Sequence, residues 1–217
     1  AASESFLKFS MDLRNYKKLP KDIILATRFT YGRSAGNSPK QFILGGMDNW
    51  VGFKTDQRNN TNNPLYNGNL AFDNRLSLLF ADFVTNMRGF NYNKASGSNH
   101  ALINAEIRMP IFKYIGVNQL NSSFLKNFQA TLFTDIGTVW NKRNPFEKQN
   151  DFNTKPIENS LPFSGQVTDF KSPILASYGL GARSTILGYF VKFDLAWGLD
   201  DGETLKPVSY FTLGYDF

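Results

Sequence analysis

The chain contains no cysteine and a single histidine. The lack of cysteine excludes disulfides and any metal or redox centre built on thiolates. No stretch approaches the ~18 consecutive apolar residues that a membrane-spanning helix requires. The opening residues, Ala-Ala-Ser-Glu-Ser, lack the basic and apolar regions of a signal peptide. We interpret this start as a removed leader or as a position within a longer protein.

Aromatic residues, by contrast, are plentiful, because phenylalanine alone occurs 21 times in 217 residues. The mean hydropathy of −0.33, taken alone, is typical of a soluble protein. The net charge of +6 is typical of proteins that bind nucleic acid or an anionic membrane surface. These charges are spread along the chain and form no basic stripe, so we expect no nucleic-acid partner.

Apolar and polar residues alternate along about seven segments, which is the pattern of half-buried β-strands. In the first segment Leu7 and Phe9 fall on one face, and Lys8 falls on the other. The longer segments reach roughly 11 to 13 residues, enough for a tilted strand to cross a bilayer core. The segments are 7–13, 23–31, 101–111, 128–140, 176–182, 189–197 and 211–217.

The two faces of these segments differ in a way that indicates lipid on one side. One face is almost wholly apolar and aromatic, and the other carries charges and glycines. Lipid outside and a polar lumen inside produce this pattern. We therefore predict an all-β transmembrane antiparallel β-barrel. The alternative fold is a soluble β-sandwich with one wet face.

The connections between the segments are unequal in length. Short turns are expected at 19–21 and 187–188, and longer polar linkers at 34–99, 141–174 and 200–206. Short periplasmic turns and long extracellular loops are the arrangement of outer-membrane barrels. Within the first linker, residues 74–84 fit either a short helix or a strand.

An odd number of strands conflicts with the even number used by single-chain bacterial barrels. An open sheet edge in lipid would also leave backbone groups unpaired. We therefore predict that residues 1–217 are the C-terminal portion of a larger barrel, whose N-terminal strands and periplasmic region lie outside this chain. That missing part and outer-membrane lipid are then its first expected partners.

Three motifs occur in a fixed order. Gly45-Gly46 and Met87-Arg88-Gly89-Phe90 lie in the longest linker, Glu106 lies on the next strand, and Phe133-Thr134-Asp135-Ile136-Gly137 follows on the strand after that. Together they resemble the BamA-type superfamily of outer-membrane assembly and secretion barrels (bacterial surface antigen barrels). The resemblance implies a 16-stranded barrel in which this chain supplies about the tenth to the sixteenth strand. The sequence Gly-Gly-Met-Asp-Asn-Trp and the long insertion that follows it resemble those of Bacteroidota members of this superfamily.

In this superfamily the loop with the Arg-Gly-Phe motif folds into the lumen, so the resemblance implies a loop–barrel lock. A guanidinium can hold two carboxylates through its five donors, which suits Arg88 to Glu106 and Asp135. Two alternatives remain open: Arg88 is a loop surface charge, or the lock stabilises the barrel without acting in transport. The predicted lock comprises Arg88, Gly89, Phe90, Glu106, Phe133, Asp135 and Gly137, and the C-terminal strand signal comprises Phe211, Leu213, Tyr215 and Phe217.

The implied function is outer-membrane protein insertion or protein translocation in a Gram-negative outer membrane. Periplasmic assembly partners and nascent outer-membrane proteins are the implied partners. The alternative is a barrel anchor or accessory subunit that carries a separate periplasmic or surface domain.

Interpretations of the chain as an enzyme have less support in the sequence than the barrel interpretation. His100 stands at a strand start, where a surface or lumen position is expected. Glu106 and Asp135 resemble a glycosidase pair, but the inward Arg88 and Arg108 favour ion pairing instead. Asp200-Asp201-Gly202-Glu203 lacks the EF-hand pattern. We expect no catalytic residue, no cofactor and no metal, so the chain is predicted not to be an enzyme.

Overall fold

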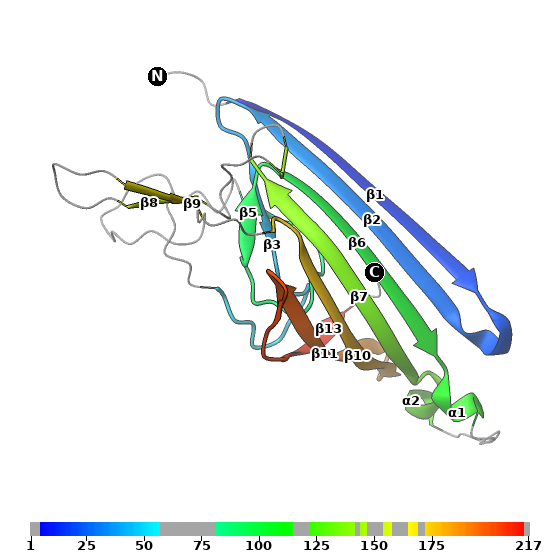
Figure 1. The fold of residues 1–217 in the computed structure, drawn as a ribbon. Helices are drawn as coiled ribbons and strands as arrows, with labels where there is room; N and C mark the ends of the chain where they lie inside the picture. Colours follow the sequence, from blue (N-terminus) through cyan, green and yellow to red (C-terminus); the bar gives the residue numbers. More distant parts are fainter. Residues whose placement is uncertain are drawn as a thin grey trace.

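The computed structural model describes residues 5–56, 81–114, 122–141, 144–146, 154–157, 165–168 and 172–214. Its main element is a curved antiparallel sheet (Figure 1). Each predicted alternating segment overlaps one of its long strands, which confirms the all-β fold. In spatial order the strands are β1 (Phe6–Lys18), β2 (Ile24–Gly36), β6 (Asn99–Met109), β7 (Gln129–Trp140), β10 (Leu175–Ile186) and β11 (Tyr189–Asp200), and β11 pairs further with β12 (Glu203–Thr204) and β13 (Val208–Gly214).

The alternation of side chains sets the two faces of this sheet. Outward apolar side chains on β6 and β7 stay open, with Ile103 51% and Leu132 50% exposed. Their inward neighbours on the same strands are buried, and Asp135 is 0% exposed. The convex face is thus apolar and open, as a lipid-facing wall requires, while the polar side chains point to the concave side.

Local backbone geometry explains the short connections at one end of the sheet. Leu187 and Gly188 join β10 to β11 with φ angles of 50° and 84°, as a two-residue type I′ hairpin turn requires. A 3-10 turn at Pro20–Asp22 joins β1 to β2. Proline at the first position of that turn supplies the required φ without losing a needed donor.

The described part of the link between β6 and β7, which the sequence did not single out, holds two short helices. They are α1 (Ile111–Tyr114) and α2 (Ser123–Lys126), at the same end as the β1–β2 turn (Figure 1). Lys113 binds Asp22, and the Tyr114 hydroxyl donates to the Lys21 carbonyl, so the two connections support each other. No helix in the described part of the chain is long and apolar enough to cross a membrane.

The described parts of the segment between β2 and β6, residues 37–56 and 81–98, lie on the concave side of the sheet and are here named the inner loop. It forms a small sheet in the order β4 (Ala81–Phe83), β3 (Gln41–Leu44) and β5 (Ala95–Gly97). Residues 81–83 are therefore strand, whereas 74–80 lie outside the described residues. In the 141–174 linker, β8 (Thr154–Ile157) pairs with β9 (Gly165–Thr168) away from the main sheet (Figure 1).

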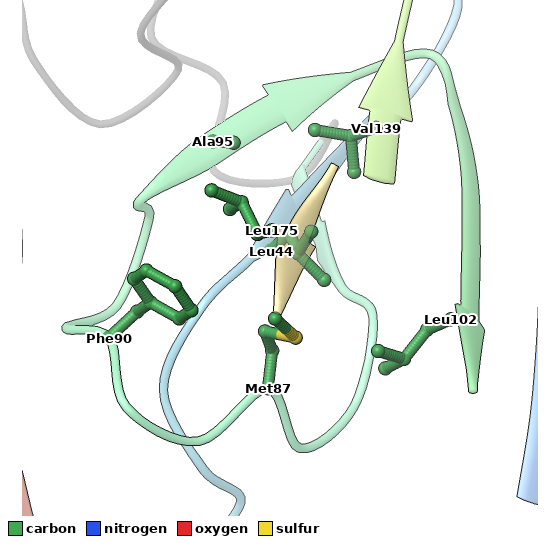
Figure 2. Close-up of a cluster of buried hydrophobic side chains, with 7 residues drawn as sticks. All are labelled: Leu44, Met87, Phe90, Ala95, Leu102, Val139 and Leu175. Carbon is green, nitrogen blue, oxygen red and sulfur yellow. The ribbon is translucent and has the colours of Figure 1, made fainter. Parts of the chain in front are cut away.

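An apolar cluster fixes the inner loop against the wall (Figure 2). Each of its members is at most 2% exposed. Burying a Leu, Met or Phe side chain stabilises a fold by about 1.5–3 kcal/mol, so this packing alone holds the loop firmly. The loop contributes Leu44, Met87, Phe90 and Ala95, and the strands contribute Leu102, Val139 and Leu175.

Candidate functional site

Arg88, at the tip of the inner loop, is fully buried on the concave side. Its Nε and Nη2 donate to the two carboxylate oxygens of Asp135, each at 2.8 Å. The Arg88 backbone N–H also donates to Asp135, at 3.1 Å. This two-pronged geometry fixes the orientation of the guanidinium as well as its position.

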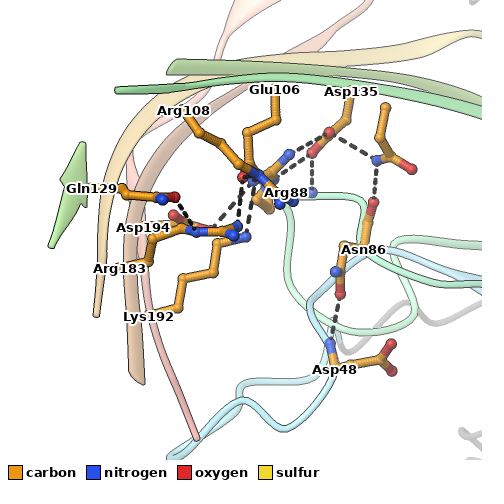
Figure 3. Close-up of polar contacts among 11 residues, drawn as sticks. Asp48, Asn86, Arg88, Glu106, Arg108, Gln129, Asp135, Arg183, Lys192 and Asp194 are labelled. Atoms are coloured by element: carbon orange, nitrogen blue, oxygen red, sulfur yellow. Dashed lines mark hydrogen bonds and ion pairs between the residues drawn. The ribbon is translucent and has the colours of Figure 1, made fainter. Parts of the chain in front are cut away.

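The remaining guanidinium nitrogen of Arg88 reaches two further strands. Nη1 lies 2.9 Å from Glu106 on β6 and 3.4 Å from Asp194 on β11 (Figure 3). Asp135 stands on β7, so a single loop side chain binds carboxylates from three strands. The loop tip therefore ties the middle of the wall to its C-terminal end.

Glu106 collects the other cations of the site. Its Oε1 accepts from Arg108 at 2.9 Å and from Arg183 at 3.2 Å, and Lys192 approaches its Oε2 at 3.4 Å. We name the whole group the Arg88 cluster. Its four cations outnumber its three anions, and each of the three carboxylates has at least one of these cations within 4 Å. The members are Arg88, Arg108, Arg183, Lys192, Glu106, Asp135 and Asp194.

Neutral groups complete the surroundings of Arg88 and Asp135. The Arg88 guanidinium carbon lies 3.4 Å from the centre of the Phe133 ring, a close cation–π contact. Asn104 donates to Asp135 at 2.8 Å and to the Asn86 carbonyl at 2.7 Å. The Phe133 ring and the Asn104 amide thus hold the loop and the β6–β7 pair in one arrangement.

Two glycines allow the loop tip to touch the wall. Gly89 has φ +86°, and a Cβ there would lie 2.6 Å from the backbone nitrogen of Gly198 on β11. A Cβ on Gly198 would lie 2.6 Å from the Gly89 carbonyl oxygen and 2.8 Å from the Phe90 ring. The two backbones can approach this closely because neither residue has a side chain.

The other predicted lock residues lie close by. The Phe90 carbonyl accepts a hydrogen bond from the buried Tyr210 hydroxyl, at 2.7 Å. Gly137 faces Leu102 and Met87, whose Cδ1 and Sδ atoms would lie 2.8 Å and 3.5 Å from an added Cβ. The absence of a side chain at Gly137 therefore leaves room for Met87, the residue before Arg88. Asn104 is the neutral side chain that hydrogen-bonds to Asp135.

Aromatic side chains join the two described parts of the inner loop to each other and to β13. The Trp50 ring lies 4.5 Å from that of Tyr210 and 5.8 Å from that of Tyr92, centre to centre. Burial, together with the Asp48 carboxylate, raises the pKa of Tyr92 to about 12. Its hydroxyl therefore stays protonated and donates to the Met47 carbonyl.

The predicted C-terminal signal is described in part. Phe211 and Leu213 lie on the open outward face of β13. Tyr215 and Phe217 lie outside the described residues. His100 is buried on β6 with its ring edge against Phe42. Within the described ranges, no group of three or more His, Asp or Glu side chains is placed to hold a metal ion.

The model of the Omp85 superfamily domain matches residues 1–217. The chain belongs to the Omp85 superfamily. At the family level this makes it an outer-membrane β-barrel domain of Gram-negative bacteria, from a group of barrels that insert or translocate proteins. No curated protein matches it.

Sequence reasoning about this Omp85 domain missed several residues of its site. The alternation in segment 189–197 puts Lys192 and Asp194 on its inward face, but alternation gives no register between strands, so it does not predict their approach to Arg88 and Glu106. Gly198 and Tyr210 continue the inward faces of the segments 189–197 and 211–217, and for the same reason alternation gives them no contact partner. Their signal was present only as a glycine and a tyrosine at inward positions of the last two long strands.

Proposed function

We propose that this Omp85 domain is the C-terminal wall of a barrel that inserts outer-membrane proteins, and that the Arg88 cluster keeps the wall in shape while strands are added at a sheet edge. The observation that carries the proposal is the burial of Arg88 between Asp135, Glu106 and Asp194, on three different strands. A loop that is bound to three strands in this way preserves the curvature of the wall when a strand is added at a sheet edge.

Insertion at an edge is favoured over passage of a polypeptide through the lumen. The inner loop occupies the inward side of β6, β7, β10 and β11, with both its charged and its apolar cluster buried. A polypeptide crossing there would have to displace the loop and break buried ion pairs, each at about 3–5 kcal/mol when one partner is lost. Strand addition at an edge uses main-chain hydrogen bonds and leaves these contacts in place.

Finer points of the proposal follow from the sequence. The sequence Gly45-Gly46-Met47-Asp48-Asn49-Trp50 supports a Bacteroidota-type member of the superfamily. Nascent outer-membrane proteins are the proposed substrates, with periplasmic assembly proteins as partners. The seven lock residues named from the sequence, Arg88, Gly89, Phe90, Glu106, Phe133, Asp135 and Gly137, are proposed to act together.

Asp135→Asn in the full-length protein is expected to slow insertion about tenfold, equivalent to ~1.4 kcal/mol. The substitution keeps the shape of the side chain but removes the charge that holds two of the guanidinium nitrogens. The measurement uses liposomes that contain the protein and a urea-unfolded eight-stranded outer-membrane barrel as substrate. The inserted fraction is read from heat-modifiable migration over time.

Lys18→Ala is the matched control, because Lys18 pairs with Asp22 at the exposed β1–β2 turn. Its insertion rate should equal that of the parent. Equal rates in empty and protein-containing liposomes would contradict the proposed function. Arrival of substrate inside the vesicles, protected from protease, would instead support translocation. A full-length protein that carries a separate periplasmic or surface domain and does not accelerate insertion of the substrate would support the anchor alternative.

A further inference from the structure

An arginine interrupts the apolar outward face of β2 near the end of that strand. Phe29 lies across from the outward Ile103 of β6, so the residues that alternate with Phe29 on β2 face outward too. Along the strand these are Leu25, Thr27, Phe29, Tyr31 and then Arg33, which is exposed. β2 pairs with β1 along one edge and with β6 along the other. Both neighbours of Arg33 in the sheet therefore belong to this chain, and strands that close the barrel pair beyond them.

Strand geometry places Arg33 at the level of lipid headgroups. At the usual rise and tilt of a barrel strand, the stretch from Leu25 to Arg33 rises about 20 Å across the membrane, close to the ~25 Å height of an outward apolar band. Arg33 lies toward the end of β2 that is opposite to the β1–β2 turn and the two short helices (Figure 1). Short turns mark the periplasmic side of outer-membrane barrels, so Arg33 faces the outer leaflet.

Three aromatic side chains lie next to Arg33 on the outward face. The Tyr31 ring lies 6.3 Å from the Phe9 ring and 6.4 Å from the Trp140 ring, centre to centre. Phe9 is the direct partner of Arg33 on β1. On the other side, Asn99 of β6 lies between Arg33 and Trp140 in the register of the sheet. Tyrosine and tryptophan gather at the boundary between membrane and water, so this group marks the level above which a cation meets headgroups.

A polar hollow adjoins Arg33 at the same rim of the sheet. β6 begins at Asn99, opposite Arg33, whereas β2 continues to Gly36. At this step lies a hollow of about 420 Å³, within the range of roughly 300–1,000 Å³ found for small-ligand sites. Of the described residues that line it, Arg33 alone is charged. The lining residues include Arg33, Ser34, Gly36, Pro39, Ser98 and Asn99.

Hydrogen bonds fix the walls of this hollow. The Ser34 N–H donates to the Ser98 carbonyl at 2.8 Å, and the Ser34 hydroxyl oxygen accepts from the Lys40 N–H at 2.8 Å. The Asn99 amide donates to the Trp140 carbonyl at 3.1 Å. These contacts hold the hollow open before a ligand arrives, so a ligand that binds there needs to order only the Arg33 side chain.

We propose that Arg33 and this hollow bind the phosphate of a lipid headgroup in the outer leaflet, with the acyl chains of the same lipid lying along Phe9, Tyr31 and Trp140. A guanidinium matches a phosphate because its planar fork donates two parallel hydrogen bonds. A phosphate partner also offsets the cost of a positive charge beside the apolar band. This inference goes beyond the proposed function, since it concerns the lipid-facing side of the wall and not the inner loop. The bound lipid sets the height of β2 relative to the outer leaflet.

Lipid binding by the full-length protein tests the proposal. The protein in detergent is titrated with phosphorylated lipid A, and native mass spectrometry gives the dissociation constant of the complex. Arg33→Gln should raise that constant at least tenfold. Arg33→Lys should give an intermediate value, because lysine keeps the charge without the planar fork. Since Arg33 is exposed, both variants should keep the heat-modifiable migration of the parent, which shows that they fold.

The matched control removes an outward cation from the other end of the sheet. Lys17 is exposed and lies across from Leu25 at the periplasmic end of β1 and β2. Lys17→Gln therefore takes away the same charge far from the hollow, and its dissociation constant should stay within twofold of the parent's. Dephosphorylated lipid A supplies the second control. It should bind the parent at least tenfold more weakly than phosphorylated lipid A does, and it should bind Arg33→Gln and the parent equally.

Three results would overturn the proposal. The first is equal binding of phosphorylated lipid A by the parent and Arg33→Gln, or an equal loss of binding in Lys17→Gln. The second is binding of dephosphorylated lipid A with the affinity of the phosphorylated form, because the acyl chains alone would then be recognised. The third is competition by inorganic phosphate at the concentration of the lipid itself, which would assign the hollow to free phosphate. None of these measurements uses insertion, so each leaves the proposed function untouched.

Discussion

Arg88→Ala is expected to abolish the compact, fast-migrating form of the barrel on gels without heating. The substitution leaves Asp135 buried without its guanidinium partner, and loss of one member of a buried pair costs about 3–5 kcal/mol. That cost corresponds to a factor of roughly one hundred to several thousand in the folding equilibrium. The midpoint of urea unfolding in detergent should fall accordingly.

A double-mutant cycle separates the ion pair from the general loss of packing. Arg88→Met with Asp135→Asn removes both charges, so it should be less destabilising than the sum of the two single changes. Arg88→Lys should be intermediate, because lysine keeps the charge but not the planar fork that holds both oxygens of Asp135. An Arg88→Ala protein with the parent's unfolding midpoint would exclude a structural lock. Normal folding with lost insertion would indicate that the loop acts in transport.

Gly198→Val is the second change with a large expected effect. The new side chain would collide with the Gly89 carbonyl and the Phe90 ring, and a neighbouring backbone cannot move aside as a side-chain tip can. Overpacking typically costs 1–3 kcal/mol, and here the loop tip must leave its place to relieve it. We expect trypsin to cut after Arg88 in the folded variant, whereas the buried Arg88 of the parent resists.

The control for this second change adds the same side chain on a neighbouring strand. Ala182 lies on the outward face of β10, directly across from Phe193, so Ala182→Val adds volume without approaching the loop. Mass spectrometry of the tryptic fragments should show no cleavage after Arg88 in that variant. Cleavage at equal rates in Gly198→Val and in the parent would show that the tip contact does not hold the loop.

Much of the wall was predictable from its alternation. Leu7 and Phe9 opposite Lys8, repeated in kind along six further segments, were enough to assign a strand and its lipid face, because the side-chain period of a strand is two. The resemblance in the Arg-Gly-Phe and Phe-x-Asp-x-Gly motifs indicates Arg88, Glu106 and Asp135 as a group of candidates from the sequence alone. These are local patterns, and a local pattern is what one sequence contains.

The remainder depends on contacts between distant segments. Asp194 lies 106 residues from Arg88, and the register that brings them together follows from every intervening strand pair. Trp50 meets Thr212 through the path of the inner loop, which no periodicity encodes. The helices between β6 and β7 are one turn each, too short for a helical repeat to appear.

Arg183 and Lys192 face each other directly across the β10–β11 hairpin. Two like charges at opposed positions disfavour a hairpin that forms alone, although its two-residue turn keeps the two strands close along the chain. Glu106, two strands away on β6, relieves that repulsion by binding both cations. A slip by one residue would instead point Lys192 into lipid, at about 2–4 kcal/mol near the midplane. Glu106 on β6 thus stabilises the β10–β11 hairpin only in its correct register.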